Sequence, residues 1–302
     1  MRAPATAAVA LLLALTACAG GEAAPSTPAP SSPDAPRTSA PAAADPTATT
    51  IGTTTPEDTV TPQQRSAGWW RPEPGTPWQW QLSGDLDLSV DVPVYDVDYQ
   101  VPREVVDRLH AQGRRVICYV SAGTVEEYRD DAHRFPDEVV GNVLGDWPDE
   151  RWLDVRRLDV IGPVLLERLD VCRAKGFDAV EPDNVDAWAN DSGFDLTGED
   201  QLRFNRWLAA AAHERGMGVA LKNDLDQVPE LVGDFDFAVN ESCARYEECD
   251  ALQPFVDAGK AVLHVEYGLT PAEFCEVGHR PGFSSMLKEG DLTAYRYVCD
   301  HG

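Results

Sequence analysis

The chain has 302 residues and a formal net charge of −26 at pH 7. Nucleic-acid binding needs clustered Lys and Arg, so this charge argues against a nucleic-acid partner. An acidic surface instead favours a cationic ligand through long-range attraction.

The N-terminus reads as an export signal followed by a tether. Residues 1–17 predict a lipoprotein signal peptide, because an early arginine precedes an apolar run too short to span a membrane. Leu15-Thr16-Ala17-Cys18 resembles the bacterial lipobox, in which the cysteine is lipidated, and an ordinary signal peptide is the alternative. Residues 18–66, rich in Ala, Pro, Ser and Thr, are expected to be disordered because they have few large apolar side chains to bury. The protein is therefore expected outside the cell, held at the bacterial membrane through this lipid only.

Strand and helix patterns alternate through residues 67–302, a length typical of one barrel domain. Helices are predicted at 102–112, 161–175 and 199–215, and a closing helix is expected after the last strand. The first connection carries no clear helix. Eight short apolar runs read as strands: 78–82, 92–97, 116–120, 176–186, 218–221, 237–240, 261–265 and 283–286.

Eight strands alternating with helices predict a single α/β domain, a (β/α)₈ TIM barrel. An open doubly wound sheet is the alternative. That alternative has no nucleotide fingerprint to support it, because neither GxGxxG nor GxxxxGK[ST] follows a strand.

The fourth strand is unusual because it ends in carboxylates. Four acidic residues fall within nine positions from Asp178 to Asp186. Pro182 forbids a helix and keeps its neighbour extended, so Glu181 and Asp183 should share one face of the strand. Crowding like charges at one strand end is costly for stability and indicates a functional site.

Polar side chains follow nearly every predicted strand, and in a barrel these ends converge on one face. Neither HxH nor HExxH is present, so no catalytic metal or other cofactor is expected. No GxSxG elbow indicates acyl transfer. Carboxylates with nearby aromatic residues favour glycoside cleavage. The strand-end residues are Asp96, Asp98, Tyr119, Ser121, Glu181, Asp183, Lys222, Asp224, Glu241 and Glu266.

Five segments together resemble glycoside hydrolase family 114, the endo-α-1,4-polygalactosaminidase-like barrels. The segments are Ile-Cys-Tyr-Val-Ser-Ala-Gly at 117–123, Val-Glu-Pro-Asp-Asn at 180–184, Leu-Lys-Asn-Asp at 221–224, Val-Asn-Glu at 239–241 and Val-Glu-Tyr at 265–267. The resemblance implies an endo-acting enzyme that cleaves α-1,4-linked galactosamine polymers. It implies Asp183 as nucleophile and Glu241 as acid/base in a retaining mechanism, with Glu266 as a rival acid. The distance between the two carboxyl groups distinguishes a retaining from an inverting mechanism, and the sequence does not give that distance.

The remaining rim residues are expected to bind substrate or support the two acids. Lys222 can lower the pKa of a neighbouring carboxylate. Asn240 would need a bulge to reach the lumen together with Glu241, because successive strand residues point oppositely. Expected binders of a substrate amine, or supports, are Asp96, Glu181 and Asp224, and expected stacking residues are Tyr95, Tyr119, Trp188 and Tyr267. Four tryptophans are expected in the core or at the barrel bottom: Trp69, Trp70, Trp78 and Trp80.

Six cysteines besides Cys18 indicate disulfides in an exported chain, with fifteen pairings open in principle. In a barrel, Cys118 would face the helix side, where Cys172, on the helix that leads into the adjacent fourth strand, can reach it. We expect Cys118–Cys172, a local Cys243–Cys249 loop and Cys275–Cys299. No CxxC or His-rich cluster accompanies them, so structural zinc is not expected.

Two other functions are compatible with the sequence. One is a non-catalytic, carbohydrate-binding surface lipoprotein, and the other is a glycosidase of different linkage specificity on the same barrel. In each case the expected partner is a cationic polysaccharide, and the protein is expected to be a monomer.

Overall fold

The computed structural model describes residues 68–299. The predicted signal peptide, the tether and Cys18 lie outside the described residues.

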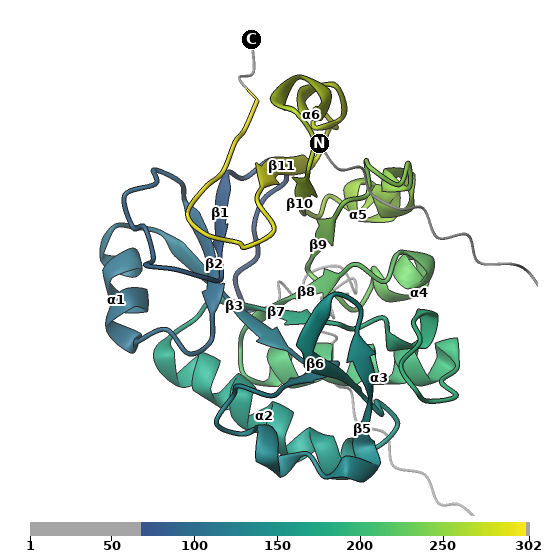
Figure 1. The fold of residues 1–302 in the computed structure, drawn as a ribbon. Helices are drawn as coiled ribbons and strands as arrows, with labels where there is room; N and C mark the ends of the chain where they lie inside the picture. Colours follow the sequence, from purple (N-terminus) through teal and green to yellow (C-terminus); the bar gives the residue numbers. More distant parts are fainter. Residues whose placement is uncertain (1–67, 300–302) are drawn as a thin grey trace, which may run out of the picture. The chain divides into compact units, whose positions relative to one another are not determined.

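Eight parallel strands form one sheet that curves into a nearly closed barrel, as predicted (Figure 1). At the seam between the first and last strands, the Trp78 indole donates to the carbonyl of Ser284 at 2.8 Å. In sheet order the strands are β1 (Trp78–Gln81), β2 (Val94–Asp98), β3 (Arg115–Ser121), β7 (Ala179–Asp183), β8 (Gly218–Lys222), β9 (Phe237–Glu241), β10 (Val262–Tyr267) and β11 (Phe283–Lys288).

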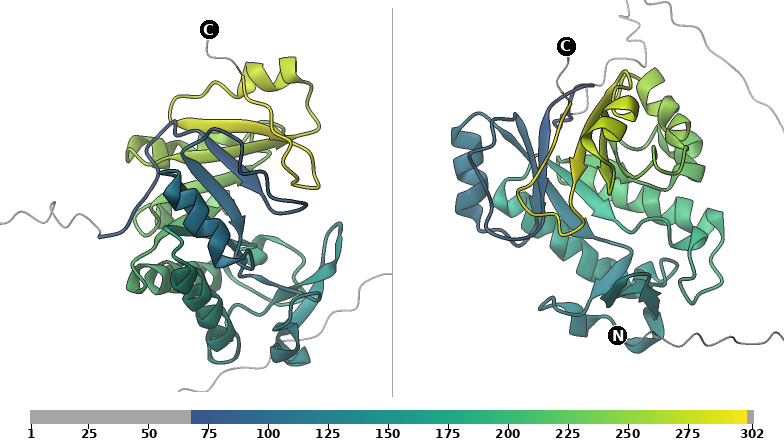
Figure 2. Two further views of the ribbon diagram at one scale, coloured as in Figure 1. Left: turned by 90° about the vertical axis from the view of Figure 1, so that its left-hand side faces the viewer. Right: turned by 45° about the horizontal axis from the view of Figure 1, so that its top comes forward.

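Helices lie outside the sheet and cover it (Figure 2). The three predicted helices are confirmed, and the connection between β1 and β2 contains no helix within the described chain. Thr197 and Asp200 form a capping box that begins α3. The helices are α1 (Arg103–Ala111), α2 (Leu158–Lys175), α3 (Gly198–Glu214), α4 (Val228–Leu231), α5 (Gln253–Asp257) and α6 (Pro271–Val277).

A small antiparallel sheet is inserted between β3 and α2. Its strands are β4 (Thr124–Glu126), β5 (Val140–Leu144) and β6 (Trp147–Leu153), in the order β4-β6-β5. We call residues 124–153 the insertion. No helix or strand is predicted for this segment from the sequence.

The predicted closing helix is wrong. After β11 the chain turns back, and Leu287 pairs with Tyr297 in an antiparallel bridge. The turn carries Leu292 at a φ of 52°, a conformation that a helix does not allow. The Leu292 carbonyl accepts from the backbone N–H of Leu82, so this C-terminal segment packs over the end of β1 (Figure 2).

Side chains alternate between the barrel interior and the helix layer, as strand geometry requires. Ile117 and Tyr119 pack with the interior cluster, whereas Cys118 packs with Cys172 in a cluster on the helix side. Trp78 and Trp80 belong to the interior cluster, as expected for core tryptophans.

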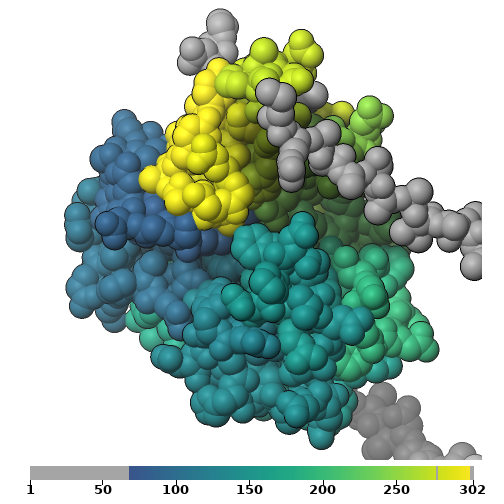
Figure 3. Space-filling model, in the orientation of Figure 1, coloured from purple at the N-terminus to yellow at the C-terminus, as the bar shows by residue number. Residues whose placement is uncertain are grey.

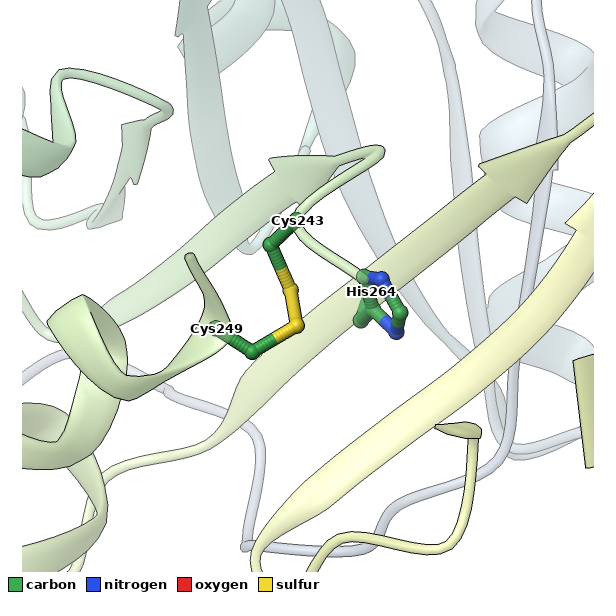
Figure 4. Close-up of side chains that lie close together, drawn as sticks. All are labelled: Cys243, Cys249 and His264. Atoms are coloured by element: carbon green, nitrogen blue, oxygen red, sulfur yellow. A yellow bond between two sulfur atoms is a disulfide. The ribbon is translucent and has the colours of Figure 1, made fainter. Parts of the chain in front are cut away.

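All three predicted disulfides are present: Cys118–Cys172, Cys243–Cys249 and Cys275–Cys299. His264 lies beside the Cys243–Cys249 bridge (Figure 4). The sulfurs are bonded to each other, so they do not supply the thiolates that a metal ion would need. Three disulfides suit an oxidising, extracellular environment.

No helix within residues 68–299 is both long and apolar enough to cross a membrane.

Candidate active site

A cavity of about 330 Å³ opens at the carboxyl ends of the strands. The barrel supplies its floor, with Trp80, Tyr119, Asp183, Lys222 and Glu241 among the lining residues. We call it the catalytic cavity.

Its walls come from outside the barrel. Trp147 and Glu150 of the insertion line one part, and Asp291 and Leu292 of the C-terminal segment line another. Figure 3 shows both segments, the insertion in teal and the C-terminal segment in yellow, on the same face of the molecule.

Lys222 joins the predicted carboxylates. Its Nζ lies 2.8 Å from Asp183 Oδ1, 2.9 Å from Glu241 Oε2 and 3.4 Å from Glu181 Oε1. The lysine side chain is only 1% exposed. Burial by itself would lower the pKa of Lys222, but the three carboxylates raise it well above its ordinary value. The ammonium therefore stays charged in the centre of the acids.

The Asp183 carboxylate is held on both oxygens. The Tyr119 hydroxyl donates to Oδ2 at 2.8 Å, and the backbone N–H of Asn184 donates to Oδ1 at 2.8 Å. Burial, together with the nearby Asp183 charge, raises the pKa of Tyr119 well above its usual range, so the phenol remains a donor. Tyr119 therefore orients Asp183.

Glu241 is fixed in a similar way from the neighbouring strand. The Tyr267 hydroxyl donates to Oε1 at 2.5 Å, and the Glu241 backbone N–H donates to Asn223 Oδ1 at 3.0 Å. The Asp183 and Glu241 oxygens that contact Lys222 can be no farther apart than the sum of their two contacts, about 5.7 Å. The two predicted catalytic carboxylates thus face one another across a single cavity.

A second pair of acids lies beneath the lysine. Asp96 and Glu181 are fully buried, and within the described chain none of their four carboxyl oxygens accepts a hydrogen bond. Glu181 is paired with Lys222 only as an ion pair, at 3.4 Å. Burial, and then repulsion from Glu181, raises the pKa of Asp96 well above its ordinary value. A protonated Asp96 can donate to Glu181, which satisfies both groups. These acids support Lys222 from below and do not line either of the two cavities described here.

The loops after β7, β8 and β9 carry strained backbone. Asn184, Asn223 and Ser242 have φ values of 60°, 48° and 63°. Left-handed geometry is uncommon outside glycine, and asparagine adopts it more readily than most residues. These three residues directly follow Asp183, Lys222 and Glu241, and backbone strain is often found at functional sites.

Two sequence expectations are corrected by the structure. Glu266 lies between inward-facing neighbours, so it points to the helix side, where it accepts from the Ala244 N–H and contacts His264 at 2.8 Å. It therefore lies outside the catalytic cavity. Tyr95 is also on the helix side, and its hydroxyl donates to the carbonyl of Val90, so it has no face available for stacking.

Asn240 and Asp224 line a second cavity, of about 270 Å³. No bulge interrupts the pairing of β9 with β10, and Asn240 and Glu241 both border this cavity without one. Trp188 lines it too, with its indole donating to Asp224 at 3.1 Å. Burial raises the pKa of Asp224 to about 7.

The insertion supplies lining residues that the sequence did not single out. Glu126 binds Arg129, which also contacts Asp98 at 2.5 Å. Burial and the neighbouring Glu126 raise the pKa of Glu150 to about 7. Trp147 is 53% exposed although it lines the catalytic cavity. In the sequence, Trp147 lies beside Asp149 and Glu150, a combination of aromatic and acidic residues that can indicate a sugar-binding segment. Nothing in the sequence placed this segment over the barrel.

Three comparisons bear on identity. The model of glycoside-hydrolase family GH114 matches residues 59–302. The crystal structure of Aspergillus fumigatus Ega3 in complex with galactosamine superposes with a TM-score of 0.73 at 38% identity, covering 76% of this chain and 97% of that one. The glycoside hydrolase domain of PelA from Pseudomonas aeruginosa has a TM-score of 0.61 at 15% identity, covering 73% and 97%, and so shares the fold. A comparison with curated protein sequences found no match.

The family match spans the whole barrel, including every strand end described above. The chain belongs to glycoside hydrolase family 114.

Proposed function

We propose that this glycoside hydrolase cleaves α-1,4-linked galactosamine polysaccharide internally, with Asp183 as nucleophile and Glu241 as acid/base. The observation that carries the proposal is that both carboxylates contact the buried ammonium of Lys222 and line one cavity. The galactosamine bound to Ega3 supports the choice of sugar.

The separation of the acids supports retention of configuration. Retaining glycosidases hold their carboxyls about 5–5.5 Å apart, whereas inverting enzymes leave about 6.5–9.5 Å for a water molecule. One oxygen of Asp183 and one of Glu241 contact Lys222, so these two oxygens are at most about 5.7 Å apart, a limit that is compatible with the first class.

In the proposed first step, Glu241 in its acid form protonates the glycosidic oxygen while an Asp183 oxygen attacks the anomeric carbon. The carbon–oxygen bond to the leaving sugar breaks, and a glycosyl ester with Asp183 forms. In the second step, Glu241 removes a proton from water, which attacks the same carbon and frees Asp183. Tyr119 and Tyr267 keep the two carboxylates aimed throughout.

Endo action is supported by a cleft that continues past the acids. The catalytic and second cavities share Asp186, Asn223 and Glu241. Exposed aromatic side chains lie on both sides, with Trp147 in one cavity and Tyr246 in the other. Aromatic faces suit sugar rings, and acidic walls suit a cationic polymer.

The proposal includes export and lipidation at Cys18, with the mature protein held on the bacterial surface as a monomer. The disulfides support an oxidising compartment. Cys18→Ala should move the protein from the membrane fraction to the medium. An unchanged membrane fraction would reject the anchor.

The test is a product assay on de-N-acetylated and fully N-acetylated galactosamine polymers. Asp183→Asn and Glu241→Gln should each lower turnover by roughly 10³ or more without loss of fold. Asp257→Asn, an exposed acid on α5, is the matched control and should behave as wild type. Near-normal turnover by both active-site variants would reject the assignment, and binding without cleavage by the wild type would indicate a lectin. The anomer released first, followed by NMR, distinguishes retention from inversion.

A further inference from the structure

The second cavity is markedly one-sided in charge. Five of its lining residues are acidic, and none of the described residues that line it is Lys, Arg or His. Burial raises the pKa of Asp186 to about 6, and the nearby Asp183 charge adds to this shift. The acids that line it are Asp186, Asp224, Asp226, Glu241 and Glu248.

An unsatisfied acceptor borders the same space. The Asn240 side chain is 1% exposed, and its Oδ1 has no hydrogen-bond donor within the described chain. Its amide nitrogen is held by Asn223 Oδ1 at 3.2 Å, which fixes the group in the cavity wall. A buried acceptor without a donor costs free energy, so a ligand that brings N–H or O–H groups would relieve it.

The carboxylates are spread too widely to coordinate a bare metal ion. Groups of three or more ligating side chains whose atoms gather within 4.8 Å occur, among residues 68–299, only at two cysteine and histidine clusters. A divalent cation needs its oxygens converging at about 2.0–2.6 Å. A sugar ring that carries an ammonium can instead reach separate acceptors around the wall.

The two cavities differ in which of the two proposed catalytic carboxylates they contain. The catalytic cavity contains both Asp183 and Glu241, whereas the second contains Glu241 alone. A nucleophile must lie under the sugar that it attacks, and an acid must lie beside the leaving oxygen. The sugar beyond Glu241 is therefore the leaving one.

We propose that the second cavity binds the leaving-group sugar and selects one with a free, protonated amine. This inference rests on the proposed function for the direction of the chain. The ammonium is bound by the acidic wall and by Asn240, and the Tyr246 ring, 63% exposed, packs on the sugar. An N-acetylated sugar at this position lacks the charge and presents an added acyl group, so it is disfavoured.

The consequence can be read from the products. Cleavage of a 1,4-linkage turns the leaving sugar into a new non-reducing end. A partly N-acetylated galactosamine polymer should therefore yield new non-reducing ends that carry mostly free amines. The new reducing ends come from the catalytic cavity, so their composition does not depend on the second cavity.

The test uses the full-length protein with the double variant Asp226→Asn/Glu248→Gln, which removes two exposed acids of the second cavity. Glu230→Gln/Asp257→Asn, two exposed acids on α4 and α5, is the matched control. The cavity variant should raise the N-acetylated share of new non-reducing ends about threefold and leave the reducing ends unchanged. Both compositions should match wild type in the control.

A binding measurement separates this inference from the proposed function. In an Asp183→Asn background, the cavity variant should weaken binding of de-N-acetylated galactosamine oligosaccharide about tenfold, and the control variant should not. If the wild type cleaves no galactosamine polymer but this loss of binding is seen, the proposed function falls and the amine site stands. If product ends and binding both match wild type, the amine site is rejected. Tight calcium binding abolished by the cavity variant would also overturn it.

Discussion

Lys222 holds the site together at the scale of single residues. A buried lysine is expensive unless its charge is matched, and here three carboxylates match it. The lysine also keeps Asp183 and Glu241 close in the absence of substrate, when their like charges would repel each other.

Lys222→Met should destabilise the protein by about 3–5 kcal/mol, because it leaves buried carboxylates without a counter-charge. Turnover should also fall, since the two proposed catalytic carboxylates, Asp183 and Glu241, lose the ammonium that both contact. Lys175→Met is the control. That lysine donates to a single backbone carbonyl, so its loss should cost about 1 kcal/mol. Urea unfolding of both variants measures the difference, and equal costs would mean that the carboxylates do not depend on Lys222.

The buried pair beneath the lysine makes a prediction about pH. The pKa of Asp96 in the folded state is raised above its ordinary value of 3.8, chiefly by burial. The folded state then binds more protons than the unfolded chain, so this residue's contribution to stability is full below about 3.8 and is lost as pH rises towards the folded pKa.

Asp96→Asn keeps a donor for Glu181 and cannot ionise. The variant should therefore gain stability relative to wild type between pH 5 and pH 8, and its own stability should vary less over that range. Urea unfolding at the two pH values measures this. A difference between variant and wild type that stays constant across the range would refute a raised pKa at Asp96.

At the scale of elements, the loop after β3 is pressed against the end of β7. The N–H groups of Ala122 and Gly123 donate to the carbonyl of Asp183 at 3.0 and 3.1 Å. The Asn184 amide donates to Ser121 and Thr124 at 3.1 Å. These contacts attach the insertion to β7, the strand that carries the proposed nucleophile Asp183.

Gly123→Ala should break this attachment. A Cβ at Gly123 would lie 1.6 Å from the carbonyl oxygen of Asn184, so the loop or the strand end must move. We expect a loss of about 3 kcal/mol or more in stability and a large loss of turnover. Gly233→Ala, with nothing within 4 Å, should be nearly neutral. Thermal unfolding and turnover measured together test this, and wild-type behaviour of Gly123→Ala would disprove the close packing.

At the scale of the whole molecule, the disulfides differ in the length of chain that they close. Cys118–Cys172 spans 54 residues and joins β3 to α2, whereas Cys243–Cys249 spans 6. In the chain-entropy account, longer loops give more stabilisation, about 4 kcal/mol for the first and about 2 kcal/mol for the second.

Replacing both cysteines of a pair by alanine should therefore lower the free energy of unfolding more for Cys118–Cys172 than for Cys243–Cys249. Guanidinium unfolding under non-reducing conditions measures the two costs. A larger loss at the short loop would contradict the entropic ranking.

The order of elements was predictable because it depends on local signals. Apolar runs of strand length, and helices that stop at Gly113, Gly176 and Gly216, predict alternating units whatever their surroundings. Parity along a strand placed Glu181 and Asp183 on one face and Cys118 on the helix side, because side chains alternate with a period of two. The three disulfide pairs followed from the same geometry and from the short spacing of the remaining cysteines.

Facts about contact between distant segments were decided only by the tertiary structure. The alternation of side chains along a strand does not show that the Lys222 ammonium contacts three acids. Nor does it place Trp147 and Leu292 in the cavity wall. Glu266 was mistaken for a rim acid because successive strand residues point alternately to the lumen and to the helix layer, so an error of one position reverses the predicted side. The C-terminal segment was mistaken for a helix because its shape depends partly on β1, which lies far earlier in the chain and is joined to it by the Leu82–Leu292 hydrogen bond. Local propensity carries no information about such partners, whereas packing and burial determine them.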